Sequence, residues 1–297
     1  MSGGFVAGFA AALVAAVCYG VAPVVQAQVA QNSPLGRGPG IGLLLRLARR
    51  PLWLVAVAGE FGGFLAEAYA FSQAPTTLVA PVAACDMLVF VVTGCLVFRY
   101  RPSATGVLGA LATIAGVLSL AVADRGDLLG RPASTGTMIV FVVCAVVAAG
   151  LAVLAGWRAG GRTVPAAIAF SAGAGVAYGI ATLATRQIGR TFHLDAVGRL
   201  LASPTPYVLV ACSLLAMGLL QRGLQTAPLI TFPIVSALSA LLPVVVGLLF
   251  LDDPAPPGWR RALLVVALAL IVAGLGLMAR DRLAAERGTA RAQSGTG

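Results

Sequence analysis

Nine stretches of about twenty almost entirely apolar residues constrain this chain more than any other feature of its sequence. They are residues 4–26, 51–72, 76–98, 104–123, 134–156, 164–185, 206–225, 229–251 and 258–279. A helix of about 20 apolar residues crosses the hydrocarbon core of a bilayer. Only 10% of the 297 residues are charged, whereas a soluble domain averages about 25%. The sequence therefore excludes a soluble enzyme and predicts an all-α, polytopic membrane protein with nine transmembrane helices.

The basic residues predict how the chain is oriented in the membrane. All 20 of them are arginines, and positive charge accumulates in short loops on the cytoplasmic side. Twelve arginines fall on the side that holds loops 37–50, 99–101 and 158–162 and the tail from Arg280, against seven on the other side. We expect a multi-pass plasma-membrane protein with its amino terminus outside and its carboxyl terminus in the cytoplasm. No basic cluster is interleaved with aromatic residues, so nucleic acid is not an expected partner.

Landmarks that recur in the same order indicate an internal repeat. The matched landmarks are Tyr19-Gly20 with Tyr178-Gly179, and Ala74-Pro75 before Pro81 with Ala227-Pro228 before Pro233. Corresponding stretches are five apart in the chain, an odd number, so the two halves would have opposite orientations across the bilayer. Inverted repeats of this kind are common in secondary transporters, whose substrate site lies near the midplane between the halves.

The repeat sets the expected organisation of the chain. We expect a first four-helix repeat over 1–133, a connecting helix within 134–163, a second four-helix repeat over 164–280 and a disordered cytoplasmic tail over 281–297. A proline inside a helix removes a backbone hydrogen bond. Because Pro81 and Pro233 occupy equivalent positions, they predict paired helix kinks that face a central cavity. The alternative is that proline is simply frequent in membrane helices.

Three acidic residues lie deep inside the apolar stretches. A charge at the bilayer centre costs about 3 kcal/mol on insertion scales, so intramembrane acids are functional by default. Glu60 and Glu67 are seven residues apart and therefore share one helix face, about 10 Å apart along the axis. Glu60 lies about 13 Å from one membrane face and Asp86 about 15 Å from the other, which places both near the midplane. The arrangement predicts a cation or proton path.

The acids and the two tyrosines of the repeat are the candidate site. We expect Tyr19, Glu60, Glu67, Asp86 and Tyr178 to line a central cavity, with Glu60 and Asp86 as the ligands of a metal ion. The alternative is that the acids are protonated or capped and serve only helix packing. Arg222, also within an apolar stretch, would either extend to the interface or act as the counter-ion of Glu60.

The second and third stretches resemble the NIPA-type magnesium transporters of the drug/metabolite transporter (DMT, EamA-like) superfamily. The residues that carry the resemblance are Pro51-Leu52-Trp53, Gly59-Glu60, Phe64, Ala68-Tyr69-Ala70-Phe71, Ala74-Pro75 and Leu78-Val79-Ala80-Pro81. Gly63 departs from the pattern, because the family has asparagine there. The resemblance implies nine helices with an outside amino terminus, Glu60 as an acid of the ion path and Pro81 as the kink.

Together these observations predict a secondary transporter of the drug/metabolite type that moves a small, cationic solute by alternating access. Magnesium is the sharpest candidate, and it would keep several of its waters. One alternative is a proton-coupled exporter of small organic metabolites or amines, and another is a membrane scaffold that transports nothing. No catalytic triad, phosphate-binding loop or metal-ligand spacing occurs, so neither enzymatic activity nor a cofactor is expected. A homodimer remains open.

Overall fold

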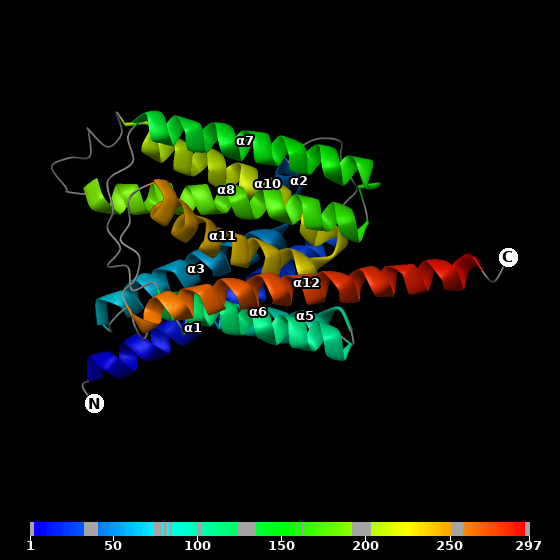
Figure 1. The fold of residues 1–297 in the computed structure, drawn as a ribbon, viewed down its shortest axis with the longest axis horizontal. Helices are drawn as coiled ribbons and strands as arrows, with labels where there is room; N and C mark the ends of the chain where they lie inside the picture. The colour runs from blue at the N-terminus through cyan, green and yellow to red at the C-terminus, as the bar shows by residue number, and fades with distance from the viewer. Residues whose placement is uncertain are drawn as a thin grey trace.

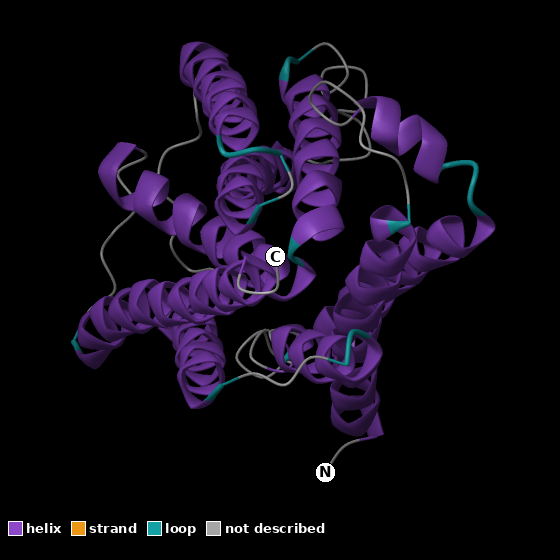
Figure 2. Cartoon of the chain, turned by 90° about the vertical axis from the view of Figure 1, so that its right-hand side faces the viewer, coloured by secondary structure: helices purple, strands orange, loops and turns teal. Residues whose placement is uncertain are grey.

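The computed structural model describes residues 3–32, 41–73, 79, 82, 85–99, 103–123, 135–161, 163–191, 203–250 and 258–294. All regular elements within these residues are α-helices (Figures 1 and 2). They are α1 (Gly3–Gln31), α2 (Ile41–Leu47), α3 (Pro51–Gln73), α5 (Asp86–Val97), α6 (Ala104–Ala123), α7 (Thr135–Arg158), α8 (Val164–Thr191), α10 (Thr205–Thr226), α11 (Pro228–Phe250) and α12 (Trp259–Ser294).

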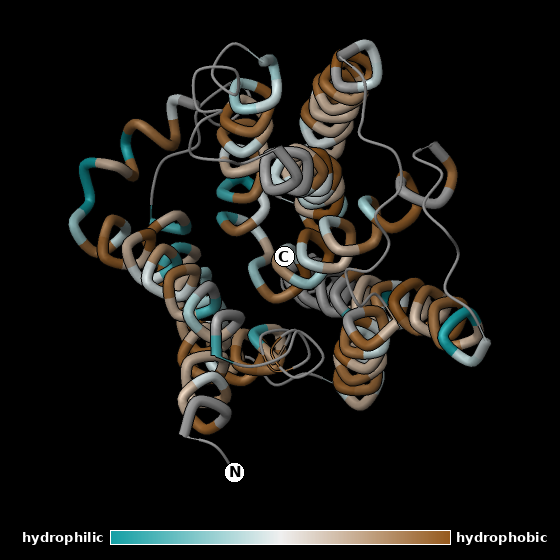
Figure 3. The backbone as a smooth tube through the Cα atoms, turned by 90° about the vertical axis from the view of Figure 1, so that its left-hand side faces the viewer, coloured by the Kyte–Doolittle hydropathy of each residue, from teal (hydrophilic) through white to brown (hydrophobic). Residues whose placement is uncertain are grey.

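Six of these helices are long and apolar enough to cross a membrane, namely α1, α7, α8, α10, α11 and α12. Two more apolar helices, α5 and α6, are shorter within the described residues. The remaining predicted stretch, residues 51–72, corresponds to α3, which carries Glu60 and Glu67 and is not among the six. Figure 3 shows that apolar residues run along most of the helices. Within the described residues, the structure therefore confirms an all-helical chain with the apolar helices of a membrane protein.

Two elements differ from the sequence-based expectation. The short helix α2 lies in a segment where no helix is predicted, and its apolar residues Leu43 and Leu47 are fully buried. Helix α12 continues to Ser294, through most of the segment expected to be a disordered tail, and its end projects beyond the bundle (Figure 1). Extending an existing helix needs no new nucleus, and the alanine, leucine and arginine residues after Asp281 favour helix.

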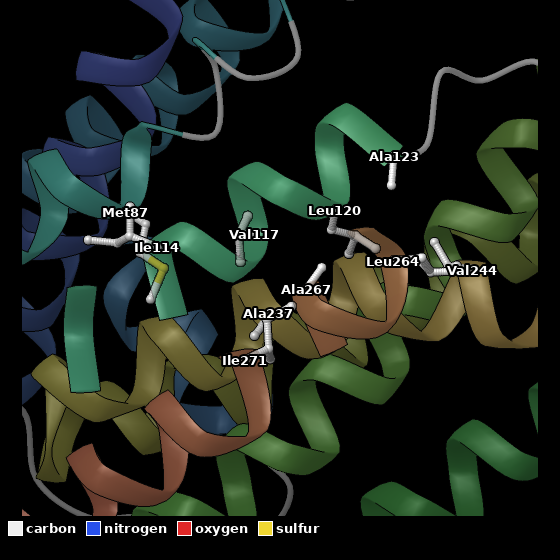
Figure 4. Packing of buried hydrophobic residues seen from close by; sticks show 10 residues of the cluster. All are labelled: Met87, Ile114, Val117, Leu120, Ala123, Ala237, Val244, Leu264, Ala267 and Ile271. Atoms are coloured by element: carbon white, nitrogen blue, oxygen red, sulfur yellow. The ribbon is translucent and has the colours of Figure 1, made fainter. Parts of the chain in front are cut away.

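Helices α6 and α12 pack closely along each other. A Cβ atom at Gly109 would lie 2.8 Å from the carbonyl oxygen of Gly274, and one at Gly116 would lie 2.9 Å from that of Ala267. Small residues allow such backbone contact between membrane helices. Because the later residue of α6 faces the earlier residue of α12, the two helices are antiparallel. Apolar side chains from α5 and α11 complete this part of the core (Figure 4).

Glycines also bring α8 against α11 and α1 against α5. Gly175 faces Leu238 and Gly179 faces Leu242, so α8 and α11 are parallel. In the first half, a Cβ atom at Gly20 would lie 2.6 Å from the carbonyl oxygen of Asp86. The Tyr-Gly pair of each half therefore uses its glycine in the same way, to approach the third helix of that half.

Candidate functional site

The five predicted site residues lie on four helices from both halves of the chain. Tyr19 lies on α1, Glu60 and Glu67 on α3, Asp86 at the start of α5 and Tyr178 on α8. Each of the five side chains is half-buried. None of them is fully exposed on the outside of the bundle, as a lipid-facing side chain would be.

Glu67 and Tyr19 form a direct contact between α3 and α1. The Tyr19 hydroxyl donates a hydrogen bond of 3.0 Å to Oε2 of Glu67. Gly63, one turn before Glu67, lies against the Tyr19 ring, since a Cβ atom there would be 3.2 Å from two ring carbons. The missing side chain at Gly63 therefore gives the ring room to reach the carboxyl group. In the sequence, Gly63 stands out only as a departure from the family pattern.

Asp86 belongs to the same group. Its carboxyl group accepts a hydrogen bond from the backbone N–H of Met87 and interacts electrostatically with Glu67. The first turn of a helix favours a negative charge because its N–H groups point outward. The Tyr19 hydroxyl interacts electrostatically with Glu67, Asp86 and Glu60. Tyr19 thus contacts Glu67 directly and feels the charges of the other two acids.

Glu60 lies two turns before Glu67 on α3 and interacts with residues of both halves of the chain. The Gln26 side chain of α1 interacts with the Glu60 carboxyl group, and Glu60 acts electrostatically on Tyr178 of α8. The Tyr178 hydroxyl in turn donates to the sulfur atom of Met217 at 3.4 Å. Glu60 therefore interacts with a residue of each half.

A pair of glutamines joins α1 to α10 beside Glu60. Nε2 of Gln221 donates a hydrogen bond of 2.5 Å to Oε1 of Gln26, and both side chains are fully buried. Further along, Nε2 of Gln225 donates to the backbone oxygen of Ala30 at 3.0 Å. The residue numbers on both helices increase together, so α1 and α10 are parallel. We call Gln26, Glu60, Tyr178 and Gln221 the inner layer.

The inner layer contains polar atoms that have no hydrogen-bond partner among the described residues. These atoms are Nε2 of Gln26 and Oε1 of Gln221. An unsatisfied buried donor or acceptor costs about 1–3 kcal/mol. The two amides were not predicted as site residues from the sequence. A neutral polar residue inside an apolar stretch is the signal that would have found them.

Arg222 and the prolines complete the comparison with the predicted residues. Arg222 is buried, with 5% of its surface exposed, and it lies near Arg46 of α2. The Glu60 carboxyl group interacts with the Gln26 side chain, and the counter-ion role of Arg222 stays a prediction. Pro233 lies inside α11, whose helix continues through it. Pro81 lies outside the described residues, so paired kinks stay a prediction.

Nor does the structure gather the acids into one dense cluster. Among the residues that the structure describes, no three His, Cys, Asp or Glu side chains are placed to hold one metal ion. A magnesium ion that keeps its waters needs only one or two carboxylates. The metal role predicted for Glu60 and Asp86 is thus neither required nor removed by this geometry.

Comparisons with protein-family models, with curated proteins and with solved structures found no match to this chain. The resemblance to NIPA-type magnesium transporters therefore stays a prediction from the residues of α3 and the segment after it.

The space at Gly63 gives a test of the contact between Tyr19 and Glu67. We expect Gly63→Ala to displace the Tyr19 ring, because the new methyl would lie 3.0 Å from Cβ of Cys18 and 3.2 Å from the ring. The same change at exposed Gly62, where nothing lies within 4 Å, is the matched control. Solute flux in proteoliposomes should fall about tenfold for Gly63→Ala, the loss of one hydrogen bond to a charged group. Equal flux in the two variants would contradict this role of Gly63.

Proposed function

We propose that the protein is a secondary transporter of the drug/metabolite type that moves a small cation by alternating access. The observation that carries the proposal is the group of three acids and two tyrosines, which comes from helices of both halves and lies among membrane-embedded helices. Intramembrane acids are costly unless they face a partner or a wet path. A scaffold without transport has no need of this cost, and enzymatic activity is not part of the proposal.

The packing of the helices supports nine spans arranged as two inverted repeats. Helices α6 and α12 are the fourth and ninth spans, and they are antiparallel, as equivalent helices of inverted repeats must be. Helices α1 and α10 are the first and seventh spans. Spans whose numbers differ by an even amount cross the membrane in the same direction, and these two helices are indeed parallel. The glycines of Tyr19-Gly20 and Tyr178-Gly179 also make equivalent approaches to the third helix of each half.

The proposed orientation places the carboxyl-terminal ends of α1 and α10 toward the cytoplasm. Their contact through Gln26, Ala30, Gln221 and Gln225 would then close the cytoplasmic side. Helix α2 packs against this contact through Leu43 and Leu47. The state described would therefore be closed toward the cytoplasm.

Flux measurements on purified protein test the proposed function. Proteoliposomes should transport at least one member of a panel of divalent cations, magnesium included, and organic amines, measured with and without a pH gradient. We expect Glu60→Gln to lower the rate at least tenfold, because a charged hydrogen-bonding group contributes about 1.5–3 kcal/mol. Glu286→Gln, in the part of α12 beyond its membrane span, is the control. Full activity of Glu60→Gln would contradict the ion-path role. Dependence on the pH gradient would favour proton-coupled export.

A further inference from the structure

Each of the two amides of the inner layer keeps one polar group that their shared hydrogen bond does not use. A side-chain amide carries a carbonyl oxygen, which can accept two hydrogen bonds, and an NH2 group, which can donate two. When Gln26 and Gln221 share one hydrogen bond, one NH2 group and one carbonyl oxygen are left over. The same two groups are left over whichever way the amide oxygen and nitrogen atoms are assigned. Reversing both assignments only changes which glutamine keeps the NH2 group and which keeps the carbonyl oxygen.

Glu60 can satisfy the donor but not the acceptor. The spare NH2 group belongs to Gln26, which interacts with the Glu60 carboxyl group, and a carboxylate only accepts hydrogen bonds. The spare oxygen is Oε1 of Gln221, whose side chain is fully buried and which has no partner among the described residues. The Glu60 carboxylate and this carbonyl oxygen are therefore two acceptors to which a molecule with hydrogen-bond donors can bind.

The surroundings favour an organic group over a bare ion. The Tyr178 side chain packs with the apolar cluster around Leu219 and Leu220, and an aromatic ring attracts a cation placed over its face. A quaternary ammonium group has the charge but no hydrogen to donate. A protonated amine or a guanidinium group has both, and guanidinium donates in several directions.

We propose that the transported cation is an organic molecule whose charged group carries N–H donors, and that this group binds between Glu60 and Oε1 of Gln221. The inference rests on the proposed function and narrows its substrate class. A hydrated magnesium ion also presents donors, through its waters, and the experiment separates that source.

The experiment compares three cations on the same proteoliposomes. Guanidinium, which stays protonated at neutral pH, and tetramethylammonium carry one charge each, but only guanidinium has N–H donors. We expect wild-type flux of guanidinium to exceed that of tetramethylammonium at least tenfold, and to exceed that of magnesium. In Gln221→Met the ratio of guanidinium flux to tetramethylammonium flux should fall about tenfold. The same substitution at Gln28, an exposed residue of α1, should change neither.

The outcomes separate this inference from the proposed function. Equal flux of guanidinium and tetramethylammonium in the wild type, or flux of magnesium alone, would overturn the N–H preference and leave a cation transporter. Absence of flux for every cation in correctly folded wild type would overturn the transporter itself. The wild-type comparison needs no variant, so it decides the question even where Gln221→Met fails to fold.

Discussion

A chemical link between positions 30 and 225 should stop transport almost completely. The Gln225 side chain reaches the backbone oxygen of Ala30 across the contact between α1 and α10, and these helices belong to different halves. Rocking of the halves around a central site requires this contact to open. We expect Ala30→Cys with Gln225→Cys, bridged by a short bifunctional thiol reagent that a reductant cleaves, to lose at least nine tenths of the flux.

The cross-linking experiment requires a background without native thiols. The five native cysteines are thiols and would react with the same reagent, so each is first replaced: Cys18, Cys85, Cys95, Cys144 and Cys212. Each single variant, treated with the same reagent, is a control that should keep its flux. Reduction of the linked protein should restore transport. Normal flux through fully linked protein would mean that this contact never opens, and alternating access between these halves would be wrong.

The repeat supplies a second control for the same experiment. This control is the counterpart of the neighbouring contact between Gln26 and Gln221: the match of Tyr19 to Tyr178 makes Gln26 equivalent to Thr185, and the match of Ala74 to Ala227 makes Gln221 equivalent to Ala68. Thr185 is exposed, and the described parts of α3 and α8 make no extensive contact. Cysteines at 68 and 185 should therefore not be linked while the contact between α1 and α10 is held closed.

The features that the bilayer imposes on the chain could be predicted from the sequence. Backbone groups in a membrane must be paired within a helix, so apolar length alone predicted where the helices lie. The acids were found for the same reason, since a charge among apolar residues is conspicuous. Of these acids, Glu67 accepts a hydrogen bond from Tyr19, and Asp86 and Glu60 act electrostatically on the same hydroxyl group, although their role stays a prediction.

What the sequence did not reveal depends on which helices of the two halves approach each other. Gln26 and Gln221 are 195 residues apart, and a neutral amide costs much less than a charge in an apolar stretch. Only their contact makes them noteworthy. Helix α2 escaped prediction because seven residues are too few for a membrane stretch, and Leu43 and Leu47 find their partners only in the assembled bundle.

Gly274→Ala should destabilise the protein by about 3 kcal/mol, at the upper end of the usual cost of overpacking. A Cβ atom at Gly274 would lie 2.6 Å from both the carbonyl oxygen of Gly109 and the backbone nitrogen of Thr113. Backbone atoms cannot rotate away as the end of a side chain can, so α12 would have to separate from α6. Unfolding of purified protein in detergent, followed with denaturant, measures the loss.

Gly276→Ala is the matched control for this substitution. Gly276 lies on the same helix two residues later, it is exposed, and nothing lies within 4 Å of its Cβ position. There the change should be neutral or stabilise by about 0.5–1 kcal/mol, because alanine is the better helix former. A loss of stability that is equal in both variants would show that helix propensity, rather than contact with α6, decides the effect. Since α6 and α12 join the two halves, a selective loss at Gly274 would identify this contact as one that holds the halves together.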